Sequence, residues 1–114
     1  VVLVNSGSGL HASPGHGLYC ASKFALRALA GSLREEERGA VRVTTIYPGR
    51  VDTPMQVRLQ AGYNRAAGRP EDDYHPEEHL RPASVAAAVR VAVDASPEAC
   101  VEDLSVRPSG LPLP

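Results

Sequence analysis

Short valine-rich segments alternate with helix-forming segments along the whole chain, and this alternation constrains the fold more than any other feature. Strands are expected at Val1–Val4, Val41–Tyr47 and Val101–Val106, separated by loops and helical patterns. A continuously apolar strand is typical of a parallel sheet that is buried on both faces. Helices then serve as the crossover connections between neighbouring strands. The sequence therefore predicts an α/β fold built on a parallel sheet.

Two helices are expected between these strands. The first spans Leu18–Arg38 and ends at Gly39, and the second spans Ala83–Ala95 after Pro82 in its first turn. In the first helix, apolar residues recur at three- and four-residue spacing, which predicts its buried face and cover on more than one side. The apolar positions are Ala21, Ala25, Ala28, Leu29 and Leu33, with Phe24 and Leu26 beside them.

The segment from residue 50 to residue 81 differs from the rest of the chain. It is polar, charged and rich in proline and glycine, with a short helix expected at Gln56–Ala67. A long irregular insertion of this kind in a compact domain is usually a binding lid or a disordered segment. Tyr63 and Tyr74 both fall in it and are both candidates for contact with a ligand.

Charge and composition exclude several classes of function. The formal net charge is −1 and the basic residues are scattered, unlike the charge pattern of a protein that binds nucleic acid. No apolar run approaches the ~20 residues needed to cross a bilayer, and the first residues do not have the pattern of a signal peptide. Cys20 and Cys100 show no metal-ligand spacing and are expected to be buried or half-buried. We therefore expect a cytoplasmic protein that binds neither nucleic acid nor membrane.

Tyr19 and Lys23 are the first candidates for chemistry. They are four residues apart at the start of the first helix, so both side chains lie on one helix face. A free tyrosine has a pKa of about 10, and a nearby ammonium group favours its phenolate form. Lys23 is also the one lysine among 12 basic residues. The pair is therefore either an acid–base pair or an aromatic–cation pair on a helix surface.

The loop after the first strand carries further candidates. Ser6 lies thirteen residues before Tyr19, at the carboxyl end of a predicted parallel strand. Ligands bind at this edge in open α/β sheets, where a hydroxyl group can hydrogen-bond a substrate carbonyl while Tyr19 protonates it. Ser8, in the same loop, is the alternative to Ser6. His16 is either part of the substrate mouth or a solvated loop histidine.

The second strand ends in a segment suited to a flat ligand. Pro48 and Gly49 close the strand, and Gly49 has no side chain to prevent a ligand from approaching the backbone. The backbone groups of Val51 and the hydroxyl of Thr53 follow, and they are able to hydrogen-bond a planar amide. This second segment is expected at the same edge of the sheet as Ser6.

Two other kinds of site are disfavoured by the sequence. The Gly7-Ser8-Gly9 stretch is only a glycine-flanked serine, because it is not set in the strand–turn–helix context of a hydrolase nucleophile. His75 and His79 have a helical metal-ligand spacing, but Pro76 between them makes a regular helix unfavourable there.

Taken together, Asn5-Ser6, Tyr19-x-x-x-Lys23 and Pro48-Gly49-x-Val51-x-Thr53 resemble the short-chain dehydrogenase/reductase family. The resemblance covers nearly the whole chain, and it rests on three spaced motifs in the family's order. It implies hydride transfer between a nicotinamide, NAD or with some preference NADP, and a carbonyl or alcohol substrate.

The resemblance also implies a role for each motif residue. Tyr19 is the implied general acid or base, Lys23 lowers its pKa and binds the nicotinamide ribose, and Ser6, favoured over Ser8 by the family spacing, orients the substrate oxygen. The implied cofactor contacts are Tyr19, Lys23, Pro48, Gly49, Val51 and Thr53, and the implied substrate contacts are Ser6, Ser8, His16 and Tyr19. Residues of about 54–81 correspond to the substrate lid, and the helix from Leu18 corresponds to the interface of a homodimer or homotetramer.

The sequence departs from the family pattern in its nucleotide-binding part. The family's glycine-rich dinucleotide loop, the residue that selects NAD or NADP and the proton-relay asparagine have no counterparts here. We therefore expect residues 1–110 to form the C-terminal, catalytic half of a Rossmann-like doubly wound sheet, with a tail at 111–114. The alternative is a non-catalytic fragment that acts as an oligomerisation or interaction module.

Overall fold

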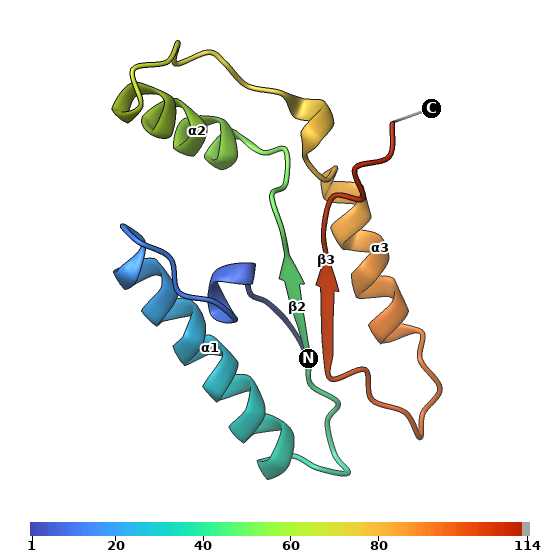
Figure 1. Ribbon diagram of the computed structural model, residues 1–114. Helices are drawn as coiled ribbons and strands as arrows, with labels where there is room; N and C mark the ends of the chain where they lie inside the picture. Colours follow the sequence, from blue (N-terminus) through green and yellow to red (C-terminus); the bar gives the residue numbers. More distant parts are fainter. Residues whose placement is uncertain (113–114) are drawn as a thin grey trace.

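Three parallel strands form the sheet of the computed structural model, which describes residues 1–112. Helix α1 lies on one side of the strands and α3 on the other, and α2 stands beyond the upper end of the sheet (Figure 1). The predicted α/β fold with a parallel sheet is confirmed. The elements, with two short 3-10 helices labelled η, are β1 (Val2–Val4), η1 (Gly7–Gly9), α1 (Gly17–Glu36), β2 (Thr44–Pro48), α2 (Pro54–Ala66), η2 (Pro76–Glu78), α3 (Pro82–Val93) and β3 (Asp103–Val106).

Strand β2 is the centre of the sheet and of the core. It pairs with β1 from Thr44 onward and with β3 up to Pro48, and all five of its residues are buried. Ile46 has no exposed surface, and β-branched residues of this kind suit a strand that is covered on both faces. Because all three strands run in one direction, their carboxyl ends meet at one edge of the sheet.

Strand β2 begins three residues later than the sequence predicted. Residues 41–43 precede the strand, and two of their carbonyl groups are bonded by charged groups. The carbonyl of Val43 accepts a hydrogen bond of 3.0 Å from Arg34, and the carbonyl of Arg42 accepts one of 2.7 Å from the amino group of Val1. The guanidinium group of Arg42 in turn donates to three carbonyls between α3 and β3, which keeps this stretch at the lower end of the sheet.

The predicted buried face of α1 is wrong. Cys20 and Ala30 are the buried residues of this helix, whereas the predicted positions Ala21, Ala25 and Leu29 are exposed. Cys20 lies against the loop after β1, where its thiol is 3.7 Å from the carbonyl oxygen of His11, whereas Leu18 and Leu29 are more than half exposed. The helix ends at Glu36, and Gly39 takes a left-handed φ of 89° in the turn that follows.

Other boundaries shift by one to three residues. Helix α2 begins at Pro54, two residues before the predicted start, because Thr53 caps it and proline suits the first helical position. The pattern Thr53-x-x-Gln56 is typical of a helix start, and it places this boundary correctly. Cys20 is buried as predicted, but Cys100 is exposed. Of the predicted tail 111–114, residues 113–114 lie outside the described residues.

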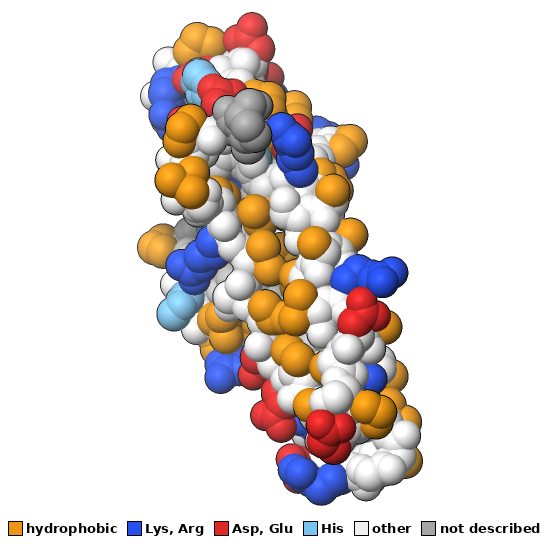
Figure 2. Space-filling view, turned by 90° about the vertical axis from the view of Figure 1, so that its right-hand side faces the viewer, with side chains coloured by type: hydrophobic (Ala, Val, Ile, Leu, Met, Phe, Trp, Pro, Cys, Tyr) orange, Lys and Arg blue, Asp and Glu red, His pale blue; other side chains and the backbone are white. Residues whose placement is uncertain are grey.

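The described chain is thin and exposes much apolar surface. Its dimensions are 52 × 37 × 19 Å and its accessible surface is 7573 Å², whereas a compact monomer of this length exposes about 6000 Å². Figure 2 shows several hydrophobic side chains down the middle of the face formed by α3, where Val91 and Val93 are more than half exposed. No helix within residues 1–112 is both long enough and apolar enough to span a bilayer.

Candidate active site

A cleft of about 1040 Å³ opens at the carboxyl edge of the sheet. The loop after β1, the first turn of α1 and the segment after β2 form its inner walls, and α2 faces them across the opening. Every residue to which the family resemblance gives a site role lines this cleft. They are Ser6, Ser8, His16, Tyr19, Lys23, Pro48, Gly49, Val51 and Thr53.

Tyr19 and Lys23 lie one turn apart at the start of α1. The Lys23 ammonium nitrogen is 5.8 Å from the centre of the Tyr19 ring and 3.4 Å from the carbonyl oxygen of Val4 at the end of β1. The Tyr19 side chain is partly exposed, and it lines the cleft together with Lys23. A pair with no role beyond the helix surface does not need to border a cleft, so this placement favours the acid–base interpretation.

Asn5 joins the three parts of the inner wall. It is buried, its side-chain amide donates a 3.0 Å hydrogen bond to the carbonyl of Lys23, and its side-chain oxygen accepts one of 2.8 Å from the N–H of Ser6. Its own N–H bonds the carbonyl of Ile46 in β2. The sequence indicated Asn5 only as part of a motif, although an asparagine directly after a buried strand was a signal for such a role.

Ser6 has a hydroxyl group that is held in place by a neighbouring backbone group. It caps the 3-10 helix η1, and its oxygen accepts a 3.2 Å hydrogen bond from the N–H of Ser8. This bond uses the oxygen as an acceptor and leaves the hydroxyl proton free to donate to a ligand. Ser8 also lines the cleft, so both serines remain within reach of a ligand there.

Gly49 lies between the cleft and the segment after β3. A Cβ atom at this position would lie 3.4 Å from Pro108 Cδ and 3.5 Å from the carbonyl oxygen of Val106. These are ordinary van der Waals distances, so the segment after β3 would tolerate a Cβ atom at this position. Gly49 also lines the cleft, and its role in the approach of a flat ligand stays a prediction.

Val51 and Thr53 present polar groups at the cleft. Val51 forms an isolated parallel bridge with Leu80, in which Leu80 bonds the carbonyl of Arg50 and the N–H of Asp52. In such a bridge the N–H and C=O groups of Val51 itself point to the opposite side of the strand. Thr53 accepts a 3.3 Å hydrogen bond from the N–H of Gln56 at the start of α2, which leaves its hydroxyl proton free to donate.

His16 and Tyr63 meet across the mouth of the cleft. The Tyr63 hydroxyl lies 2.7 Å from His16 Nε2, and this contact joins the start of α1 to α2. Helix α2 belongs to the segment predicted as the lid, residues 54–81, and this segment is called the lid below. Tyr63, Leu59 and Met55 recur at four-residue spacing and line the cleft, so they form the inner face of the lid. Tyr74 does not line the cleft, which separates the two tyrosines that the sequence left equivalent.

The returning part of the lid carries a histidine between two carboxylates. The two ring nitrogens of His75 lie 3.1 Å from Glu77 and 3.0 Å from Asp73. The hydrogen bond with Glu77, followed by the one with Asp73, raises the pKa of His75 above its usual 6.5. Both nitrogens can donate at once only in the imidazolium form.

Residues 1–64 match the family model described as short chain dehydrogenase. An uncharacterized NAD-dependent oxidoreductase of Mycobacterium tuberculosis is 53% identical over 57 residues, which are 48% of this chain and 20% of that protein. The mouse dehydrogenase/reductase SDR family member 11 is 34% identical over 94 residues, which are 80% of this chain and 35% of that protein.

The solved structures include the same fold. An alcohol dehydrogenase from the archaeon Thermococcus sibiricus, complexed with 5-hydroxy-NADP, superposes with a TM-score of 0.71 at 26% identity. The superposition covers 99% of this chain and 43% of that one. The chain thus spans less than half the length of each of these three relatives.

Replacement of Gly9 tests the role of Asn5. A Cβ atom at position 9 would clash with the Asn5 side-chain oxygen and lie 2.9 Å from its Cγ. We expect Gly9→Ala to lower the free energy of unfolding by about 1–3 kcal/mol, measured by urea denaturation. Gly7→Ala is the matched control, because nothing lies within 4 Å of its Cβ position. Equal stability of the two variants would contradict this account.

The raised pKa of His75 predicts a pH dependence of the lid. When folding raises the pKa of a group, protonation of that group stabilises the folded protein. The stabilisation is complete below the pKa of the unfolded chain, and it is lost as the pH rises through the pKa of the folded protein. We expect amide exchange in residues 73–79 to be slower at pH 6 than at pH 8 after correction for intrinsic rates. An NMR titration should give His75 a pKa above 6.5, which Glu77→Gln lowers. A measured pKa of 6.5 or lower for His75 would contradict this prediction.

Proposed function

Because the chain belongs to the short-chain dehydrogenase family, we propose that it carries the catalytic residues of an NAD(P)-dependent oxidoreductase. The proposed reaction is the transfer of a hydride between a nicotinamide and a carbonyl or alcohol group. One observation carries the proposal: Ser6, Tyr19 and Lys23 border the same cleft as the free N–H of Val51. One space is therefore bordered by a proton donor, Tyr19, and by the ammonium group of Lys23 beside it. The Ser6 hydroxyl and the Val51 N–H add two hydrogen-bond donors.

The residues of the chain divide the proton chemistry among them. A bound nicotinamide supplies or accepts the hydride. In the reduction, Tyr19 gives its hydroxyl proton to the substrate oxygen, and Ser6 donates a second hydrogen bond to the same oxygen. The ammonium group of Lys23, beside the Tyr19 ring, favours the phenolate that remains. In the oxidation the same groups act in reverse, and Tyr19 is the base.

The segment after β2 fits the amide end of a nicotinamide. The N–H of Val51 is left unpaired by the bridge with Leu80, and the Thr53 hydroxyl keeps a free proton, so both are donors for a carboxamide oxygen. The M. tuberculosis relative is named as NAD-dependent, and the T. sibiricus structure holds an NADP derivative. We therefore propose a nicotinamide dinucleotide and keep both NAD and NADP as candidates.

A second candidate function is supported by the outer face of α1. Leu18 and Leu29 lie on one side of the helix that carries the catalytic pair, and they are 92% and 59% exposed. An exposed apolar helix face is typical of a protein–protein contact. We propose that this face forms the interface of a homodimer or homotetramer. If the chain has no affinity for the cofactor, its function would be limited to this oligomerisation.

Removal of the Tyr19 hydroxyl tests the catalytic role. In the full-length protein, Tyr19→Phe should lower kcat by about 100- to 10,000-fold, since the general acid is lost. The dissociation constants of NADH and NADPH, followed by nicotinamide fluorescence, should change by less than about 3-fold. Tyr47→Phe is the control, because Tyr47 is buried outside the cleft. Full turnover by Tyr19→Phe would refute the proposed mechanism.

The assembly is tested by a charge on the outer face of α1. Sedimentation analysis of the unaltered protein should give a mass above that of one chain, and Leu29→Glu should lower it. Val57→Glu serves as the control, because Val57 is also exposed, on α2, and lies outside the cleft lining. A wild-type monomer would rule out this assembly.

A further inference from the structure

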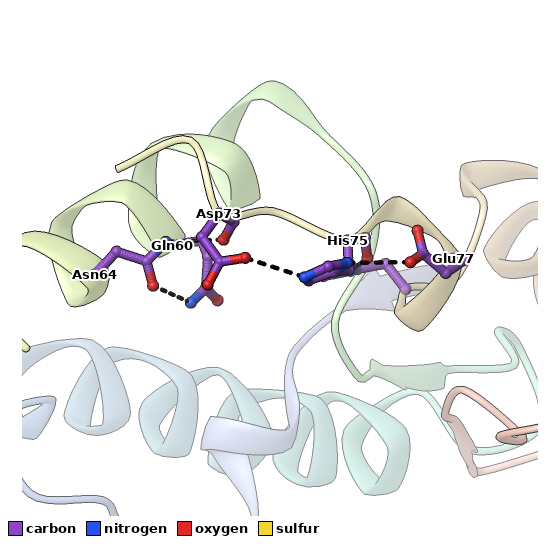
Figure 3. A network of polar contacts seen from close by, with 6 residues as sticks. Gln60, Asn64, Asp73, His75 and Glu77 are labelled. Atoms are coloured by element: carbon purple, nitrogen blue, oxygen red, sulfur yellow. Dashed lines mark hydrogen bonds and ion pairs between the residues drawn. The ribbon is translucent and has the colours of Figure 1, made fainter. Parts of the chain in front are cut away.

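The lid, residues 54–81, is held together from within by a buried asparagine. Asn64 has no exposed surface, and its side-chain amide donates a 2.8 Å hydrogen bond to the carbonyl of Asp73. Its side-chain oxygen accepts a 3.0 Å bond from Gln60 one turn earlier in α2. Figure 3 shows this group beside the row formed by Asp73, His75 and Glu77. The position of α2 is therefore tied to the returning segment that follows it.

The returning segment is in turn bonded to the stretch that follows β2. Leu80 makes two backbone hydrogen bonds there, 2.9 Å to the carbonyl of Arg50 and 2.8 Å from the N–H of Asp52. The Tyr74 hydroxyl donates a third bond of 2.8 Å to the Asp52 carboxylate. Asp52 lies between Val51 and Thr53, the two residues proposed to bind the nicotinamide amide.

The environment of Tyr74 fixes the direction of its hydrogen bond. Burial, followed by the bond to Asp52, raises the pKa of Tyr74 to about 12, so its hydroxyl stays protonated near neutral pH and donates. The ring of His79 packs on Tyr74 with 4.7 Å between ring centres. His79 is itself buried, and its Nδ1 lies 2.8 Å from the carbonyl oxygen of His75, which holds the ring in place.

This group lies behind the cleft and not in it. Val51 and Thr53 line the cleft, whereas Asp52, Tyr74 and His79 do not. A role in direct contact with the substrate is therefore excluded by their position. The Tyr74 bond to the Asp52 side chain and the two backbone bonds of Leu80 join the lid to residues 50–53, which is the part of the cleft wall that carries the Val51 N–H.

We propose that Tyr74 and Asp52 are positioning residues that couple the lid to the nicotinamide site. Their hydrogen bond, together with the Leu80 bridge, holds the Val51 N–H toward the cleft, so that order in the lid and affinity for the cofactor depend on each other. The inference rests on the proposed function, because it assigns the Val51 N–H to the nicotinamide amide. It goes beyond that function in giving a cofactor-binding role to residues that do not contact the cofactor.

Three substitutions separate this coupling from a general effect on folding. Tyr74→Phe removes only the hydroxyl and keeps the ring against His79. Asp52→Ala removes the acceptor, whereas Asp52→Asn keeps an acceptor oxygen at the same position. Glu71→Gln is the control, because it weakens the exposed Arg65–Glu71 ion pair in the same lid without touching the proposed path.

The measurement has two readouts in the full-length protein. NMR amide exchange at Asp52 and Leu80 reports the bridge in the absence of cofactor, and nicotinamide fluorescence gives the dissociation constants of NADH and NADPH. For Tyr74→Phe and Asp52→Ala we expect about 3- to 10-fold faster exchange and 3- to 10-fold weaker cofactor binding, the effect of one lost hydrogen bond. KM for the cofactor should rise in proportion, with kcat changed less than about 2-fold.

The remaining variants decide between positioning and plain structural support. Asp52→Asn should restore cofactor affinity to within about 2-fold of the wild type, and Glu71→Gln should leave both readouts unchanged. The double variant Tyr74→Phe/Asp52→Ala should be no weaker than either single variant, because both remove the same bond.

Each contrary outcome has its own meaning. If Tyr74→Phe and Asp52→Ala exchange faster but keep their cofactor affinity, the positioning role is overturned and the proposed function stands. Unchanged amide exchange in these two variants would have the same meaning. A wild-type protein that binds neither NADH nor NADPH would overturn the proposed function and this inference with it.

Discussion

The parallel pairing of β2 with a neighbour on each side is the constraint on which the rest of the structure depends. Because β1, β2 and β3 run in one direction, the residues that follow each strand emerge at a single edge. Ser6 follows β1 and Val51 follows β2, so two segments separated by more than forty residues form one cleft wall. Burial of all five residues of β2 makes this arrangement stable, since a shift of register would expose part of the core.

The two walls of the cleft are held by different means. On the inner wall, buried Asn5 joins the end of β1, the serine loop and α1, so that Ser6 and Lys23 are placed by the same side chain. On the lid side, Asn64, Tyr74 and Leu80 connect α2 to the segment after β2. The His16–Tyr63 contact closes the space between the two walls. Both walls thus rely on hydrogen bonds that buried polar groups make within the chain. Loss of such a bond is costly, because it leaves a buried donor or acceptor without a partner.

The site was easier to predict than the packing around it. The spacing of Tyr19 and Lys23 is local, and a helix places such residues on one face whatever surrounds it. The buried face of α1 was predicted wrongly because apolar residues are spread around much of that helix, and only the position of the sheet selects Cys20 and Ala30. The exposure of Cys100 was misjudged for a related reason, since Val43, whose carbonyl its thiol contacts, lies more than fifty residues away in the sequence.

The sequence by itself determined the α/β class, the strand order along the chain and several of the residues that line the cleft. Periodicity and local spacing are properties of short segments, and they survive in any fold that keeps those segments. Only the tertiary structure decided that residues 54–81 are hydrogen-bonded to the segment after β2, with Tyr63 facing the cleft and Tyr74 behind it. These features depend on hydrogen bonds such as Tyr74 to Asp52, which join residues that no local pattern relates.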